Sequence, residues 1–229
     1  DNSVGEAFNQ LTLSNRPTLG NVDLSSQGGS STAECVTFDG TDDYMVGPSA
    51  GSGSSLETNM RPTIDYFTFA MLISGGSTLD GGIFDRSINV SGNMFCEYRL
   101  EVFQNSLGNA YFSRRIGDQV DLPVTSGNIA SLPTIMINSI GYDTELADHV
   151  DYFWMDSDPP SDAVATANYG GHYDSGSSTY LGALLGPSGI SQHFAGNIHE
   201  IIIFKNRLSV GNFNDYGLNE EMVNAIARY

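Results

Sequence analysis

The chain has 229 residues, enough to bury a sizeable core, and its 26 glycines and 8 prolines separate short apolar runs as in an all-β protein. It carries 27 acidic residues against 9 basic ones, a net charge of −18, which excludes binding to a nucleic-acid backbone because that requires clustered Lys and Arg. The charge also disfavours an anionic membrane surface, and no apolar run approaches the roughly 18–20 residues that span a bilayer. We therefore expect neither nucleic-acid binding nor membrane insertion.

The first 34 residues are mostly polar and predict a peripheral N-terminal segment, with one weak strand over 8–13. The chain begins at Asp1 without a methionine, so we expect a processed chain or a domain cut from a longer protein. A Ser- and Gly-rich run over 25–31 predicts a surface loop.

Residues 35–46, Cys-Val-Thr-Phe-Asp-Gly-Thr-Asp-Asp-Tyr-Met-Val, form two short alternating runs around an Asp-Gly turn. They predict a hairpin or a corner between strands, because Gly40 can adopt a positive φ. Asp39, Asp42 and Asp43 cluster beside this turn, and hard carboxylate oxygens suit calcium. The alternative is that the same aspartates brace the corner by accepting backbone N–H groups.

Six further runs predict core strands, because they are apolar, rich in β-formers and bounded by turn residues. In the first, Phe67, Phe69 and Met71 share one parity. The second and third are expected to pair with each other. The runs are 66–73, 94–102 with 110–112, 133–138, 150–155 and 180–185.

The stretch from Phe194 to Phe204 is the strongest strand signal in the chain. Ile198 lies on one parity and Ile201 and Ile203 on the other, which predicts a β-bulge near His199 and Glu200 or a strand buried on both faces. Helical spacing of apolar residues after Asn219 predicts a short C-terminal helix over 215–229, packed on the sheets. Turn signals every ~8–15 residues and the absence of a sharp composition shift predict one two-sheet domain over 1–229.

Cys35 and Cys96 are the two cysteines, and both lie in apolar strand-like runs. Buried free thiols are the simpler interpretation, and one disulfide is the alternative.

Three segments resemble laminin-G-like, concanavalin A-like lectin and glucanase domains: Val36-Thr-Phe-Asp-Gly-Thr-Asp-Asp-Tyr-Met, Phe67-Thr-Phe-Ala-Met-Leu-Ile, and Phe194-Ala-Gly-Asn-Ile-His-Glu-Ile-Ile-Ile-Phe-Lys-Asn-Arg-Leu-Ser. Arg16-Pro-Thr-Leu and the last four residues, Ile-Ala-Arg-Tyr, are similar to lectin-like domains attached to bacterial surface and phage proteins. The resemblance implies an all-β, antiparallel jelly-roll sandwich of two sheets. The scaffold hosts binding modules, adhesive modules and glycanases, so the resemblance does not choose among them.

A glycanase needs two carboxylates flanking the scissile bond, and no Glu-x-Asp-x-(x)-Glu string typical of such glucanases occurs here. Glu97 and Glu101 share a parity with Arg99 between them, which we interpret as an ion-paired strand face and not as a catalytic row. No Gly-x-Ser-x-Gly elbow is present either. We therefore expect a protein that is not an enzyme.

Glycan binding uses aromatic faces that stack on a sugar ring and polar groups that contact its hydroxyls. Tyr169, His172 and Tyr173 lie in a Gly-rich polar loop and are the candidate ligand-binding residues, although tyrosines of such a loop can also lie back on a sheet. Trp154 is a further candidate, with core packing as its alternative.

The leading hypothesis is a non-catalytic module that binds a surface glycan or polysaccharide, as part of a larger extracellular, cell-surface or virion appendage protein. The alternative is a structural decoration or adhesion domain, acting through contacts with its own copies or with other virion or surface proteins. A glycan-cleaving enzyme is third. No cofactor is indicated beyond a possible calcium ion.

Overall fold

The computed structural model describes residues 8, 10, 12–22, 33–48, 67–75, 81–104, 110–116, 120–124, 133–143, 148–155, 161–163 and 177–204. These residues form β-strands and connecting turns, together with one turn of 3-10 helix, η1 (Leu13–Asn15). None of the described segments contains a helix long and apolar enough to cross a membrane. The helix predicted over 215–229 lies outside the described residues.

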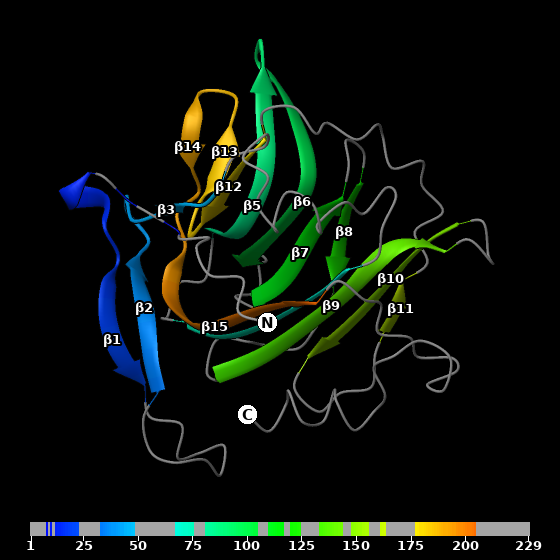
Figure 1. Ribbon diagram of the computed structural model, residues 1–229, viewed down its shortest axis with the longest axis horizontal. Coiled ribbons are helices and arrows are strands. Elements are labelled where there is room, and N and C mark those ends of the chain that lie inside the picture. The colour runs from blue at the N-terminus through cyan, green and yellow to red at the C-terminus, as the bar shows by residue number, and fades with distance from the viewer. Residues whose placement is uncertain are drawn as a thin grey trace.

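A seven-stranded antiparallel sheet runs across the lower half of Figure 1. Its strands, in spatial order, are β1 (Thr18–Val22), β2 (Ala33–Asp39), β15 (Ala195–Phe204), β4 (Phe67–Gly75), β9 (Pro133–Asp143), β10 (Asp148–Met155) and β11 (Ser161–Ala163). The strands predicted at 66–73, 133–138, 150–155 and 194–204 are all present. The edge strand β1 was not predicted, because its sequence, Thr-Leu-Gly-Asn-Val, has a weak apolar pattern interrupted by Gly.

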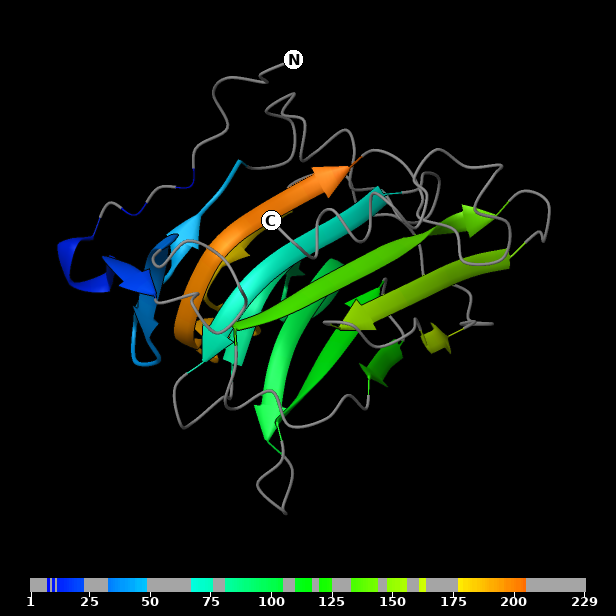
Figure 2. The ribbon, with the colours of Figure 1, turned by 90° about the horizontal axis from the view of Figure 1, so that it is seen from below.

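A six-stranded antiparallel sheet forms the other layer of the sandwich, and its strands β5 and β6 rise in the upper half of Figure 1. In spatial order the strands are β3 (Met45–Val46), β12 (Ser178–Leu181), β5 (Gly81–Val90), β6 (Asn93–Gln104), β7 (Ala110–Ile116) and β8 (Val120–Val124). The predicted pairing of 94–102 with 110–112 is confirmed as β6 against β7. A small hairpin of β13 (Leu184–Gly186) and β14 (Gly189–Ser191) accompanies this sheet, and Figure 2 shows the layers from below. The predicted fold class, an all-β antiparallel jelly-roll sandwich, is confirmed.

The core lies between the two sheets and is built from aromatic pairs. Phe38 of β2 and Phe194 have ring centroids 6.2 Å apart, and Phe84 and Tyr98 of the six-stranded sheet have centroids 6.1 Å apart. Each ring is at most 2% exposed, so these pairs remove large apolar areas from water. Cys35 and Cys96 are buried and are not in a disulfide, as the simpler interpretation predicted.

The central strand β15 carries the predicted bulge. Its pairing with β4 shifts register between Ile198 and Glu200, so His199 is the extra residue on the bulged strand. Ile198, on the N-terminal side of the bulge, is 3% exposed and belongs to the core. The parity switch in the sequence therefore has the structural cause that was expected.

Two sequence predictions are wrong. Residues 8 and 10 are not in a strand and residues 13–15 are helical, because the Gln10 side chain bonds the Thr12 amide and the Tyr44 carbonyl in place of a strand ladder. The run 180–185 is two strands, β12 and β13, in different sheets. Gly182 separates them with a φ of 82°, and a Cβ at this position would overlap the ring of Phe38.

Candidate functional site: a groove beside the strand corner

The chain passes from the seven-stranded to the six-stranded sheet at a corner between β2 and β3. Gly40 has a φ of 77°, and a Cβ there would lie 2.7 Å from the Cβ of Ala195. Glycine is therefore required by both conformation and space. Of the two alternatives for 35–46, the corner is correct and the hairpin is not, because β2 and β3 belong to different sheets.

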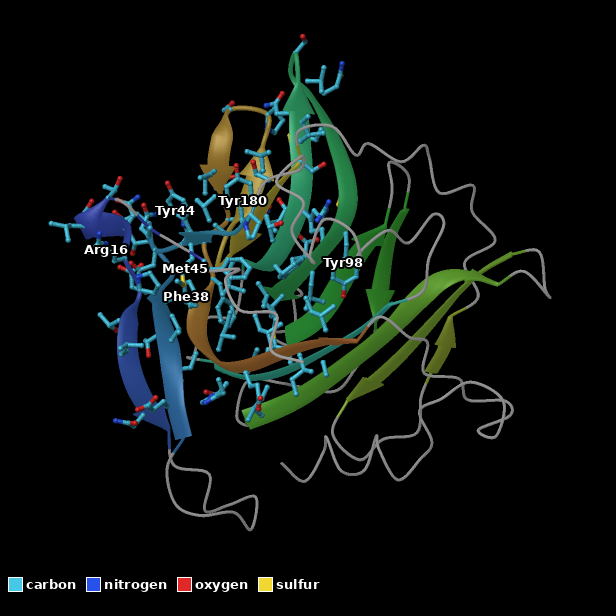
Figure 3. The ribbon with its side chains drawn as sticks, viewed as in Figure 1. Arg16, Phe38, Tyr44, Met45, Tyr98 and Tyr180 are labelled. Atoms are coloured by element: carbon cyan, nitrogen blue, oxygen red, sulfur yellow. The ribbon has the colours of Figure 1, made fainter. Side chains whose placement is uncertain are left out.

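The N-terminal segment is fixed against this corner by Gln10. Its Nε2 donates to the carbonyl of Tyr44 at 3.1 Å, and its Oε1 accepts the amide of Thr12 at 2.9 Å. The amide of Tyr44 donates in turn to the carbonyl of Asn15 at 3.2 Å. These bonds hold the segment beside β3, where Figure 3 shows Arg16, Tyr44 and Met45 near one another.

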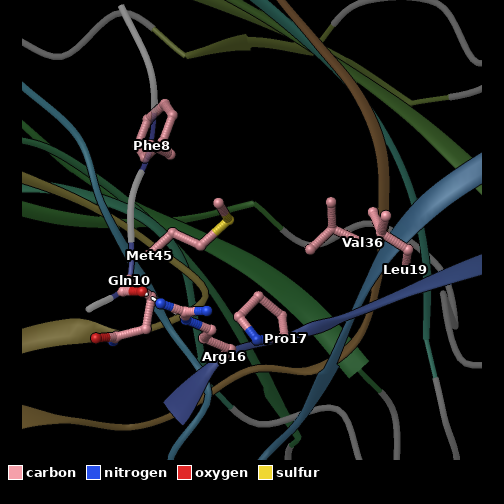
Figure 4. A pocket seen from close by; sticks show the side chains of 7 residues that line it. All are labelled: Phe8, Gln10, Arg16, Pro17, Leu19, Val36 and Met45. Atoms are coloured by element: carbon pink, nitrogen blue, oxygen red, sulfur yellow. Dashed lines mark hydrogen bonds between the residues drawn. The ribbon is translucent and has the colours of Figure 1, made fainter. Parts of the chain in front are cut away.

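This arrangement leaves an open cavity of about 280 Å³, which we call the N-terminal groove. Its lining comes from the N-terminal segment and from the first three strands, and Figure 4 shows these side chains around the opening. The lining residues are Phe8, Gln10, Arg16, Pro17, Leu19, Val36 and Met45.

Most of the groove is apolar. Leu19 of β1 and Val36 of β2 are direct partners in the strand register, and Leu19 is 88% exposed. Phe8 lies directly on Gly47, since a Cβ at that glycine would come within 2.7 Å of the ring. An aromatic ring held against backbone, beside exposed aliphatic side chains, provides a surface that the apolar face of a ligand can cover.

Arg16 is the charged member of the groove. Its Nε donates to the carbonyl of Gln10 at 2.7 Å, the bond drawn as a dashed line in Figure 4. A guanidinium has five N–H groups, so four remain for a ligand. No carboxylate among the described residues forms an ion pair with Arg16, and its side chain is exposed.

Asp39, Asp42 and Asp43, the corner carboxylates, have oxygens within 4.8 Å of one another. Oδ1 of Asp39 accepts the amides of Thr41 at 2.7 Å and Asp42 at 3.3 Å, and Oδ2 of Asp43 accepts the amide of Asp39 at 3.0 Å. The bond from Thr41 is the main cause that lowers the pKa of Asp39, whereas burial is the main cause that raises the pKa of Asp43. The predicted bracing of the turn is therefore present.

The corner carboxylates fit a calcium ion only in part. Calcium takes six to eight oxygens, and each of these three residues offers one ligand atom. Two of their six carboxylate oxygens already accept backbone amides. An ion here would need water or carbonyl oxygens for most of its shell, and calcium binding stays a prediction.

Arg99 of β6 forms a buried ion pair with Asp85, its cross-strand partner on β5. Its Nη2 lies 3.1 Å from Oδ2 of Asp85, which is 0% exposed and belongs to β5. The Ser87 hydroxyl donates to the other oxygen of Asp85, and the amide of Leu185 donates to Oδ2 at 2.6 Å. Nη2 of Arg99 also donates to the carbonyl of Leu185 at 2.8 Å, so this cluster ties β13 to β5 and β6.

A ladder of polar side chains crosses β2, β15 and β4. Oγ1 of Thr37 donates to Oδ1 of Asn197 at 2.7 Å, and Nδ2 of Asn197 donates to Oγ of Ser74 at 3.1 Å. Ser74 is hydrogen-bonded to Nε2 of His199 at 2.9 Å. Nδ1 of His199 is buried without a partner in the described part of the chain, and burial lowers the pKa of this histidine. His199 is thus half-buried in a central strand.

Nothing in the described part of the chain places the predicted glycan-binding residues in this groove. Tyr169, His172 and Tyr173 lie outside the described residues. The backbone of Trp154 pairs with Ile137 in the β9–β10 ladder, and its side chain is not described. Their role stays a prediction.

Sequence reasoning missed the groove itself. Arg16 was noticed as part of a family-like motif, but nothing local indicated that it would stand beside Met45. The groove joins residues up to 37 positions apart, because β1, β2 and the corner bring residues 8 and 45 to one place. An arginine within the polar N-terminal segment of an acidic chain was the one signal available.

No protein-family model and no curated protein sequence matches this chain. Solved structures do. A native heptameric SAP-like pentraxin from Limulus polyphemus is 12% identical with a TM-score of 0.52, and the match covers 80% of this chain and 84% of the pentraxin. The Ruminococcus gnavus IT-sialidase CBM40 bound to α2,3 sialyllactose is 9% identical with a TM-score of 0.52, over 76% of this chain and 91% of the module.

A Trypanosoma rangeli sialidase in complex with sialic acid is 14% identical with a TM-score of 0.52. This match covers 76% of the present chain but 26% of the sialidase. At such low identities the three likenesses show the fold, a lectin-like β-sandwich, and nothing finer.

Proposed function

We propose that this chain is a non-catalytic carbohydrate-binding module and that the N-terminal groove holds one sugar residue of its ligand. The observation that carries the proposal is the groove itself: an apolar wall beside an exposed arginine that pairs with no described carboxylate, on a lectin-like sandwich. The fold is shared with a CBM40 whose structure contains α2,3 sialyllactose, which supports a glycan as the class of ligand. The groove is an open surface hollow, as suits binding without turnover.

The proposal extends to the finer expectations from the sequence. The module belongs to the laminin-G-like group and acts at a cell surface or on a virion, as part of a larger protein. Tyr169, His172 and Tyr173 contribute further contacts to an extended glycan, with Trp154 as a fourth candidate.

A glycan array followed by calorimetry on the hits tests the function, with and without calcium. We expect the affinity for a bound glycan to fall at least about fivefold in Phe8→Ala, because about 1 kcal/mol of stacking is lost. Leu13→Ala is the matched control: Leu13 is also exposed and apolar, at 77%, but does not line the groove. The absence of any binding at millimolar sugar would overturn the function, and equal effects of both substitutions would remove the groove from it.

A further inference from the structure

We propose that the sugar bound in the N-terminal groove carries a carboxylate and that the Arg16 guanidinium binds it. This inference rests on the proposed function and adds the chemical class of the ligand. Three features of the described residues lead to it: the way in which Arg16 is held, its lack of an ionic partner, and the size of the apolar wall beside it.

The bond from Nε to the Gln10 carbonyl orients Arg16 before any ligand arrives. Gln10 is itself fixed by Tyr44 and Thr12, so the acceptor cannot easily turn away. Since Nε has a single N–H, the pair of terminal nitrogens is the edge left for a planar, two-oxygen acceptor. Less rotamer entropy is lost on binding when an arginine is held in this way.

Among the described residues, nothing neutralises the charge of Arg16. Acidic residues outnumber basic ones three to one, 27 to 9, yet no described carboxylate pairs with this guanidinium. Arg99, by contrast, is buried against Asp85. An exposed arginine without a partner can bind an anion without breaking an internal ion pair.

The net charge of −18 does not prevent this binding. At an ionic strength near 0.15 M the screening length is about 8 Å, so distant surface carboxylates act weakly on a ligand in the groove. The arginine, in direct contact, forms charge-assisted hydrogen bonds, which are stronger than those between neutral groups.

The rest of the groove fits a sugar ring better than a simple inorganic anion. Phe8, Pro17, Val36 and Met45 offer carbon surface to the C–H groups of a ring, which a phosphate or sulfate could not cover. The cavity of about 280 Å³ lies at the lower limit of ligand pockets, roughly 300–1,000 Å³, and suits one sugar residue.

Matched pairs of small glycosides test the inference by calorimetry at 0.15 M NaCl. The first pair is methyl β-D-glucuronide and methyl β-D-glucoside, which differ in the carboxylate. The second is the α-methyl glycoside of N-acetylneuraminic acid and its methyl ester. We expect at least one acid to bind at least tenfold more tightly than its neutral counterpart, and the pair that shows the difference identifies the source as a uronic or a sialic acid.

The protein variants are Arg16→Gln, Arg16→Lys and, as control, Arg115→Gln. The control substitution makes the same change in net charge, but on β7. In the six-stranded sheet β7 is the fourth strand along from β3, so the two strands are about 19 Å apart. We expect Arg16→Gln to reduce the affinity for the acid at least tenfold and to leave the neutral sugar unchanged. Arg16→Lys should recover part of the lost affinity, since lysine keeps the positive charge but lacks the planar pair of nitrogens that binds both carboxylate oxygens.

Equal binding of acid and neutral sugar, or equal effects of Arg16→Gln and Arg115→Gln, would overturn the inference. If neutral glycans bind with sensitivity to Phe8→Ala, the proposed function stands while the carboxylate preference falls. If no glycan binds at all, both fall together. Thermal unfolding of each variant checks that the loss of the Arg16–Gln10 bond has not unfolded the chain.

Discussion

At the scale of single residues, His199 shows how a β-bulge creates a titratable site inside a sheet. The bulge gives the imidazole no cross-strand partner of its own, and the side chain reaches Ser74 through one nitrogen while burying the other. Burial without a second partner disfavours the imidazolium, so the folded protein holds this histidine at a lowered pKa.

This arrangement predicts a pH-dependent stability. Because the folded pKa lies below the ordinary 6.5, the stabilising contribution is complete above pH 6.5 and is lost as the pH falls toward the folded value. Urea unfolding from pH 7.5 to 5.5 should show a falling midpoint in the native protein and a flatter curve in His199→Gln. Parallel curves for the two proteins would contradict this origin.

At the residue scale, prediction from the sequence succeeded where the residue type and its immediate neighbours determine the backbone conformation. Gly40 was expected at a positive φ and has one. The burial of His199 could not be predicted from the sequence, because it depends on strands that are far away in the chain. The corner carboxylates were identified together, because their hydrogen bonds are local.

At the scale of elements, the β13–β14 hairpin is attached through charge. Asp85 accepts the Leu185 amide while holding Arg99, and Arg99 donates to the carbonyl of the same leucine. A hairpin of six strand residues has little area of its own to bury, so this buried cluster fixes its position on β5 and β6.

We expect Asp85→Ala to reduce the free energy of unfolding by about 3–5 kcal/mol, because it removes the carboxylate that faces the buried Arg99 guanidinium and the acceptor of the Leu185 amide. Glu34→Ala, which removes an exposed carboxylate from β2, should change it by less than about 0.5 kcal/mol. Denaturant titration measures both. The double variant Asp85→Ala/Arg99→Ala should lose less than the sum of the single losses, and strict additivity would show that the pair does not act as a unit.

Several strands that bury an apolar face were predicted, but β5, which is buried from Gly81 to Ser87, was not. β4, β9, β10 and β15 follow apolar patterns that the sequence displays directly. β1 lies at a sheet edge, where one side of the ladder is enough to hold a strand of weak propensity. The break at Gly182 depends on the ring of Phe38, which comes from a distant strand.

At the scale of the whole molecule, charge and topology act in opposite directions. The acidic residues behind the net charge of −18 repel one another in the compact state. Fifteen strands in antiparallel ladders hold the described part of the chain together against this repulsion. The groove is a property of this scale as well: its arginine, aromatic ring and aliphatic wall come from separate elements. No local pattern in the sequence therefore predicted it.

Screening that repulsion should stabilise the protein. We expect the urea midpoint at pH 7 to rise between about 10 mM and 300 mM NaCl, over which the screening length falls from about 30 Å to about 6 Å. At pH 5 the rise should be smaller, because the net charge approaches zero toward the pI of about 4.2. A midpoint that falls with salt at pH 7 would mean that attractive ion pairs outweigh the net repulsion.

The position of β15 between β2 and β4 has a consequence during synthesis on the ribosome. Thr37 and its partner Asn197 are 160 positions apart, so at about 5–20 residues per second β2 waits roughly 8–30 s for the strand beside it. Throughout that interval the nascent chain presents two open strand edges, which can pair with other chains. We therefore expect the newborn protein to need protection from such pairing until this apolar stretch completes the sheet.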